Sequence, residues 1–175
     1  MAPTEKRKPW LYSGDAPKIV NVAIASSQTF DAGTPAIVKN DGYAYAAVSF
    51  TSSSVNALHG FFLADSTNPA KGTKVRMAKV TNDQIWAIYL SNAGADTVAA
   101  QANVGDLNGL VVETTTAPRI GYSTCDVSIT PTAAQGGLLI QDILANQEDS
   151  KNTTTDDPGV VLVKVTQVCI DASVA

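Results

Sequence analysis

His59 is the only histidine among the 175 residues, so a Ser-His-Asp catalytic triad would have to use it. Ser52, Ser53 and Ser54 lie nearby in the sequence and would be the nearest nucleophiles. No Gly-x-Ser-x-Gly elbow presents any of them, and a single histidine beside a glycine is more typical of a turn or a strand edge. We therefore predict no catalytic residue and no enzymatic activity. A small hydrolase that uses His59 is the least favoured interpretation.

Residues that could bind a metal ion are few and widely spaced. One histidine and two distant cysteines do not provide the clustered spacing of a zinc site. Carboxylates at Glu148-Asp149 and Asp156-Asp157 would suit calcium, but the chain lacks a calcium loop with ligands at alternate positions. We interpret these residues as solvated loop charges. The sequence also lacks a phosphate-binding loop and a dinucleotide fingerprint, so we predict no metal site and no cofactor.

The two cysteines, Cys125 and Cys169, do not define a disulfide framework. We interpret both as small buried hydrophobic residues, and a disulfide between them is the alternative if their strands are neighbours. The run Gly105-Asp106-Leu107-Asn108-Gly109 predicts a tight turn before a strand at Leu110–Glu113, because glycine supplies a positive φ and Asp or Asn caps the turn.

The elements that would have to hold any site are strands, because Val and Thr each outnumber Leu, a bias that suits pleated sheets. Turn signals at Asn40-Asp41-Gly42 and Asn82-Asp83 each predict a hairpin between the strands on either side. The spacing of the apolar residues within 139–144 predicts one short helix. The predicted strands are Lys18–Ala25, Ala36–Lys39, Tyr43–Phe50, Phe61–Ala64, Lys74–Val80, Ile85–Leu90, Gly109–Glu113, Cys125–Thr130 and Val160–Ile170.

Short strands at close spacing favour a barrel or a sandwich. We predict a mostly β fold class, either a small β-barrel or β-tulip or a jelly-roll-like sandwich, with at most one short helix. Residues 1–17 are predicted to form an extended N-terminal arm, because the prolines in this segment block regular structure. Residues 18–175 are predicted to form a single β domain with an insertion or loop region at 132–157.

The predicted arm combines basic and aromatic residues in a pattern typical of a docking tail. Lys6, Arg7 and Lys8 are followed by Trp10 and Tyr12, and a large aromatic side chain is costly to leave in water. We predict that these five residues contact a partner. A frayed terminus is the alternative.

The predicted strand Ile85–Leu90 is apolar on both faces, whereas a half-exposed strand alternates. It therefore either lies in the centre of the core or carries a subunit contact through Trp86, Ile88 and Leu90. Burial in the core is the commoner reason for such a pattern, and self-association through these three residues is retained as a prediction.

Charge and hydropathy argue against two classes of partner. The net charge of −4 and the pI of about 4.8 argue against a nucleic-acid binder, which needs a basic face. No stretch approaches the roughly 18 apolar residues of a membrane helix. The N-terminus does not resemble a secretory signal, so we expect synthesis in a cytoplasm. Only 16% of the residues are charged, so either a protein partner covers some apolar surface or Ser, Thr and Asn supply the polar surface instead.

One stretch resembles a known class of protein. The turn Gly105-Asp106-x-Asn108-Gly109, followed by Leu110-Val111-Val112 and then Glu113-Thr114-Thr115-Thr116, is similar to a pattern in small virion proteins of tailed phages. The upstream segment from Gly72 to Tyr89 has the same style, and the resemblance covers residues 36–172. On these residues the chain resembles the tailed-phage capsid decoration proteins, also called cement or head-stabilising proteins.

The resemblance implies a structural virion protein with a small β-barrel or β-tulip body. Such a protein binds the outer surface of the capsid and clamps neighbouring subunits of the major capsid protein, often as a homotrimer with an N-terminal arm at the contact. The expected location is therefore the capsid exterior, after synthesis in the host cytoplasm. The alternative is a head-fibre or lectin-like module that binds a receptor or glycan, in which Tyr43, Tyr45, Trp86 and Tyr89 could stack on sugar rings.

Overall fold

The computed structural model describes residues 8–39, 41–47, 49–50, 58–93, 95–112, 123–130, 137–144 and 159–166. The protein is mostly β, which confirms the predicted fold class. Besides one 3-10 turn, η1 (Gln101–Asn103), the elements are β1 (Trp10–Ser13), β2 (Ile19–Ala23), β3 (Thr29–Phe30), β4 (Pro35–Val38), β5 (Ala44–Ala46), β6 (Ser49–Phe50), β7 (Gly60–Phe62), β8 (Ser66–Thr67), β9 (Lys74–Lys79), β10 (Ile85–Asn92), β11 (Ala95–Asp96), β12 (Leu107–Val112), β13 (Ser123–Asp126), β14 (Leu138–Leu144) and β15 (Val160–Val165).

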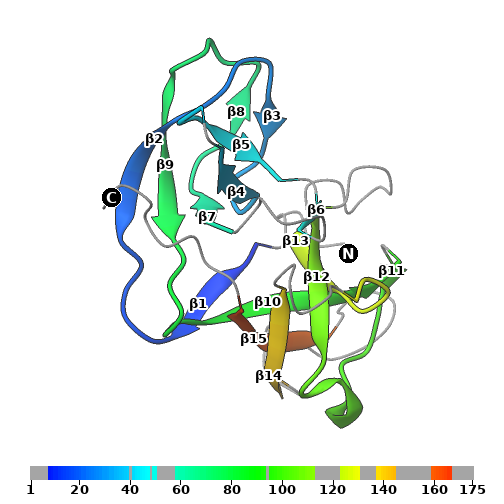
Figure 1. The fold of residues 1–175 in the computed structure, drawn as a ribbon. Helices are drawn as coiled ribbons and strands as arrows, with labels where there is room; N and C mark the ends of the chain where they lie inside the picture. Colours follow the sequence, from blue (N-terminus) through cyan, green and yellow to red (C-terminus); the bar gives the residue numbers. More distant parts are fainter. Residues whose placement is uncertain are drawn as a thin grey trace, which may run out of the picture.

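The larger sheet is partly closed into a small barrel, which fills the lower half of Figure 1. Its pairings run in a ring: β10 pairs with β13, β13 with β12, β12 with β14, β14 with β15, and β15 again with β10. Strands β1 and β11 also pair with β10, and β6 pairs with β12. Because side chains alternate along a strand, Trp86, Ile88 and Leu90 of β10 all face the buried interior, together with Val161 and Val163 of β15.

The smaller sheet lies in the upper half of Figure 1 and has the strand order β2-β9-β7-β4-β5. Ile24, just after β2, forms a bridge with Ala44 of β5, so the first and last strands of this sheet meet at one end. Its inner side carries a separate buried cluster that includes Phe62 and Met77. The two-stranded β3–β8 sheet brings Phe30 onto this cluster, where its ring stacks on Phe62 at a centroid distance of 4.0 Å.

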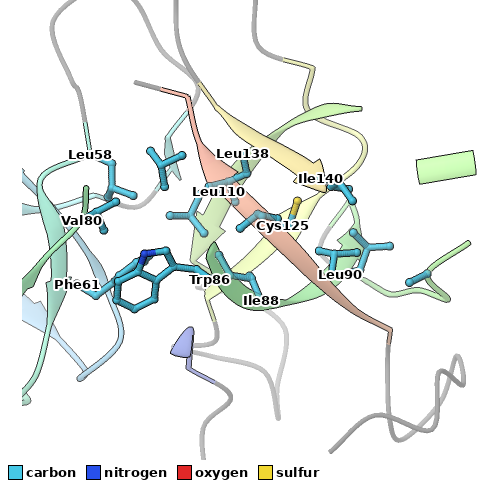
Figure 2. Packing of buried hydrophobic residues seen from close by; sticks show 14 of the residues in the cluster. Leu58, Phe61, Val80, Trp86, Ile88, Leu90, Leu110, Cys125, Leu138 and Ile140 are labelled. Carbon is cyan, nitrogen blue, oxygen red and sulfur yellow. The ribbon is translucent and has the colours of Figure 1, made fainter. Parts of the chain in front are cut away.

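The two sheets are joined by one continuous hydrophobic cluster. Phe61 of β7 packs against Trp86 of β10 with ring centroids 4.8 Å apart, and Leu58 and Val80 lie in the same cluster (Figure 2). A buried hydrogen bond from Ser123 Oγ to the carbonyl oxygen of Gly33, 2.9 Å long, adds a second link. The sheets therefore share a core at their boundary.

The structure confirms one predicted hairpin and overturns the other. Strands β4 and β5 pair antiparallel around the Asn40-Asp41-Gly42 turn, where Gly42 has a φ of 78°. The hairpin predicted around Asn82-Asp83 is wrong, because β9 and β10 belong to different sheets. The connecting segment turns a corner: Gln84 Oε1 accepts a hydrogen bond from the Thr81 N–H at 3.0 Å, and Gln84 Nε2 donates to the Asp15 carbonyl at 3.0 Å.

The short helix predicted within 139–144 is wrong, because these residues form strand β14. A β-bulge explains the misleading pattern. Ile140 pairs with Val163, but the next pair joins Asp142 to Leu162, so Gln141 is an extra residue. The bulge shifts the alternation by one position, which brings Ile143 onto the interior cluster and Leu144 onto an outer one. The apolar residues Leu139, Ile140, Ile143 and Leu144 consequently resemble a helical stripe.

Regular structure begins earlier than predicted. Residues 1–17 were expected to form an arm outside the β domain, but Trp10–Ser13 is a strand that pairs with Ile85, Trp86 and Ala87 of β10. Trp10 also packs edge-to-face on Tyr89, with ring centroids 5.8 Å apart. These contacts attach the N-terminal segment to the barrel from residue 10 onward.

Candidate contact surfaces

His59 makes a hydrogen bond with a structural role. It lies between Leu58 and β7, and its Nδ1 atom accepts a hydrogen bond from the backbone N–H of Val38 at 3.1 Å. This bond ties the connection before β7 to the end of β4. The serines nearest in sequence, Ser52, Ser53 and Ser54, lie outside the described residues.

The structure bears on the metal and cysteine predictions only in part. Among the described residues no group of three or more His, Cys, Asp or Glu side chains could hold a metal ion, and no described helix is long and apolar enough to cross a membrane. Glu148-Asp149 and Asp156-Asp157 lie outside the described residues, as does Cys169. Cys125 is a free, buried thiol, and this burial raises its pKa, so it is an unreactive hydrophobic residue as predicted.

The turn predicted at residues 105–109 is shorter than expected. Gly105 has a φ of 95°, which favours glycine, and Asp106 N–H donates to the carbonyl of Asn103 at 3.1 Å. Strand β12 already begins at Leu107, so Asn108 and Gly109 are buried strand residues and not part of the turn.

Three of the five predicted docking residues can be placed. Lys6 and Arg7 lie outside the described residues, and Lys8 is exposed. The stem of Lys8 covers Gly33 so closely that a Cβ atom on that glycine would lie 2.7 Å from Lys8 Cγ. Trp10 is half-buried on Tyr89, whereas Tyr12 exposes 49% of its surface. Tyr12 is thus the accessible aromatic residue of this set.

The predicted self-association residues do not form a surface. Trp86 is only 3% exposed, and Ile88 and Leu90 are fully buried inside the barrel (Figure 2). The Nε1–H of Trp86 donates to Gln84 Oε1 at 3.2 Å within the same buried region. The prediction of a subunit contact through these residues is therefore wrong. The strand is apolar on both faces because its outer residues, such as Ala87, belong to a second buried cluster.

Two of the four aromatic residues considered for sugar stacking lie on the surface. Tyr43 and Tyr45 flank buried Ala44, so both point to the outer side of the smaller sheet, and each is half-buried. The ammonium group of Lys39 lies 4.0 Å from the ring centroid of Tyr45, and that of Lys71 lies 4.5 Å from the ring of Tyr43. We call these four residues the Tyr/Lys surface. Trp86 is buried and Tyr89 packs against Trp10, so neither adds to it.

A hydrogen bond organises one edge of the Tyr/Lys surface. The Tyr45 hydroxyl donates to Asp41 Oδ2 at 2.6 Å. This bond is the main reason that the pKa of Asp41 is lowered and the pKa of Tyr45 is raised. The sequence signal for this surface is the Tyr-x-Tyr spacing directly after a hairpin turn, but the two lysines come from separate loops and were not foreseen.

A second surface was missed at the sequence level. Asn21 of β2 lies opposite Arg76 of β9, and Leu63 donates its N–H to the Arg76 carbonyl at 3.0 Å, so their side chains share one face of the smaller sheet. Ile19 and Lys74 lie on the same face by alternation along β2 and β9. We call these five residues the cationic face. Ile19 is 44% exposed and Leu63 is 42% exposed, so two large apolar side chains of this face are accessible beside its basic residues.

The described part of the molecule thus has two surfaces with accessible side chains, the Tyr/Lys surface and the cationic face. No protein-family model matches the chain, and no curated protein shows significant similarity to it.

Proposed function

We propose that the protein is a structural virion protein of the capsid-decoration type. It binds the outer surface of a phage head and stabilises the head by clamping neighbouring subunits of the major capsid protein, with further copies of itself as a second partner. A clamp needs a rigid body, broad contacts and many identical sites, because modest contacts then act together through avidity.

The observation that carries this proposal is the way β1 presents the N-terminal segment. Pairing with β10 fixes residues 10–13 on the barrel, and Tyr12 is the most exposed of the large apolar residues on the described surface. Lys6, Arg7 and Lys8 lie four to six positions before it in the sequence. A basic segment that starts from a fixed point beside an exposed aromatic residue is suited to dock on an acidic, partly apolar protein surface.

The proposal is tested by co-sedimentation with purified heads. The probe is a panel of tailed-phage heads from which any resident decoration protein has been stripped. We expect the protein to pellet with at least one member of the panel in a saturable manner. Tyr12→Ala should weaken this binding by about tenfold, since a buried aromatic anchor contributes on the order of 1–2 kcal/mol.

The matched control for this test is Val98→Ala, which removes another exposed apolar side chain far from β1 in the sequence. It should leave binding unchanged. Failure of the protein to pellet with every head in the panel would overturn the proposal, and equal effects of the two variants would remove the role of Tyr12.

A second candidate function is favoured by the Tyr/Lys surface. Tyr43 and Tyr45 present neighbouring rings on an outer sheet face, a spacing that suits stacking on sugar rings, and Lys39 and Lys71 could bind acidic sugars after moving off the rings. A head-fibre or lectin-like module would use such a surface. A glycan array probed with the wild-type protein and with Tyr43→Ala tests this function. Binding that the substitution abolishes would support it, and an array without signal would exclude it for the glycans present.

A further inference from the structure

The charges of this chain are divided unevenly along its sequence. Residues 1–80 contain nine of the 12 Lys and Arg residues and five of the 16 Asp and Glu residues, a net charge of +4. Residues 81–175 contain the other three basic and eleven acidic residues, a net charge of −8. The division falls between β9, the last strand of the smaller sheet, and β10, the first barrel strand in the ring. The net charge of −4 therefore hides a basic first half and an acidic second half of the sequence.

The basic half has an accessible surface that can make a contact. On the cationic face, Lys74 and Arg76 are exposed, and neither forms an ion pair with an acidic side chain in the described residues. Ile19 and Leu63 lie on the same face and are both more than two-fifths exposed. A surface with uncompensated positive charge around apolar side chains fits a partner that is acidic and partly apolar.

The acidic half has exposed carboxylates at the far end of the barrel. Asp106 precedes β12 and Asp142 lies at the bulge of β14, and both side chains are exposed. The two are held close together because the Ile140 N–H donates to the Asp106 carbonyl at 3.0 Å, two residues before Asp142. We call this pair the acidic end. In Figure 1 the start of β12 and the end of β14 lie toward the lower end of the barrel, away from the smaller sheet at the top.

We propose that copies of this chain associate head to tail, with the cationic face of one copy seated on the acidic end of the next. The cationic face belongs to the smaller sheet and the acidic end to the barrel, so the contact joins different surfaces of two copies. A contact between two different surfaces is heterologous, and it generates a closed ring if the rotation between copies closes. This inference rests on the proposed self-association and deepens it, since a trimer would be such a ring; it does not depend on binding to a capsid.

Salt dependence separates this contact from a purely apolar one. Charge pairs at a rim steer association and are screened when the Debye length falls below their separation. Light scattering behind a sizing column should give a multiple of 18.2 kDa at about 20 mM salt and a mass near 18.2 kDa at about 0.5 M salt. A monomer at every salt concentration, or an oligomer that salt does not affect, would overturn the proposal.

Two variants with the same net charge test the location of the contact. One double variant combines Lys74→Gln with Arg76→Gln, and the other combines Gln101→Glu with Gln141→Glu. Each double variant changes the net charge from −4 to −6, and all four positions are exposed. The first pair removes the cationic face and should weaken association at low salt at least tenfold. The second pair adds negative charge beside the acidic end and should leave association intact or strengthen it. Equal weakening by both would show a net-charge effect and contradict the proposal.

Charge exchange gives the most specific result. The double variant Lys74→Glu, Arg76→Glu makes both surfaces acidic. The double variant Asp106→Lys, Asp142→Lys makes both surfaces basic. Each of these variants alone should therefore be monomeric at low salt. An equimolar mixture should associate into alternating assemblies such as mixed pairs, because each surface of one variant then meets a surface of opposite charge on the other. A mixture that stays monomeric would contradict the head-to-tail contact. Since no head is present in these assays, their failure is distinct from a failure of capsid binding.

Discussion

Ala93 has a backbone conformation that L-residues rarely adopt. Its φ is 49°, at the turn between β10 and β11, and its N–H donates to Asp126 Oδ1 at 3.1 Å. Glycine adopts such a φ without steric cost, so Ala93→Gly should raise the free energy of unfolding by about 0.5–1 kcal/mol in urea titrations. The control is Ala95→Gly in β11, where glycine weakens a strand and should lower it. The same sign for both substitutions would contradict this account.

The hydrogen bond between Tyr45 and Asp41 predicts a pH effect. Because the bond lowers the pKa of Asp41, its contribution to stability is present above the pKa of an unfolded aspartate and is lost as the pH falls through the lower folded value. Tyr45→Phe should therefore raise the pKa of Asp41, measured by NMR titration of its carboxyl carbon. Tyr43→Phe keeps the Tyr43 N–H bond to Asp41 and should leave that pKa unchanged. An unchanged pKa in Tyr45→Phe would rule out the bond in solution.

The sequence was most misleading about which single residues form contact surfaces. Trp86, Ile88 and Leu90 suggested a subunit contact because they are large and apolar, yet all three line the barrel interior. Ile19 and Leu63 were not singled out, although they are exposed on the cationic face. Alternation shows which residues share a face of a strand, but the packing of the whole sheet decides which face meets solvent.

At the scale of elements, the bulge in β14 makes a sharp prediction. Deletion of Gln141 removes the extra residue and leaves every other pair with β15 in register, so the variant should fold with a free energy of unfolding within about 1 kcal/mol of wild type.

Deletion of Lys164 is the matched control, because it also removes a polar strand residue but from regular pairing. It would turn Val165 away from the core and should cost about 2 kcal/mol or more. Chemical denaturation compares the two deletions. Equal destabilisation would show that the β14 register is not set by the bulge.

Turn signals predicted local pairing well and distant pairing poorly. The Asn40-Asp41-Gly42 turn produced a hairpin because a glycine with positive φ reverses the chain within a few residues. The segment at Asn82-Asp83 carries a similar signal, but Gln84 bonds to the distant Asp15 carbonyl and the chain crosses into the other sheet. The closure of β10 onto β15 likewise depends on residues far apart in sequence, which no local pattern specifies.

At the scale of the whole molecule, the shared core predicts that the two sheets unfold together. Phe61 of the smaller sheet packs on Trp86 of the barrel (Figure 2). Phe61→Ala should lower the free energy of unfolding by about 3–5 kcal/mol and speed hydrogen exchange in both sheets. Leu63→Ala, an exposed neighbour, should change stability by no more than about 0.5 kcal/mol. Faster exchange confined to the smaller sheet in Phe61→Ala would show that the sheets are independent.

Composition was enough to predict the fold class, but it did not reveal how the charge is divided along the chain. Abundant Val and Thr predicted the mostly β fold, and the overall charge of −4 gave no sign of two oppositely charged halves. That division acquires meaning only when the topology shows that residues 1–80 supply the smaller sheet and residues 81–175 most of the barrel. The proposed self contact follows from this arrangement, whereas the proposed capsid contact rests on β1 and the exposed Tyr12.

The central claim, that the protein decorates a phage head, is tested most directly by electron cryomicroscopy of stripped heads incubated with the purified protein. The account predicts added density on the outer surface only, in groups of three copies that bridge neighbouring capsid subunits. Each copy should fit the barrel and the smaller sheet, with β1 toward the shell. Heads that carry no added density, or density restricted to the tail or fibres, would contradict the claim.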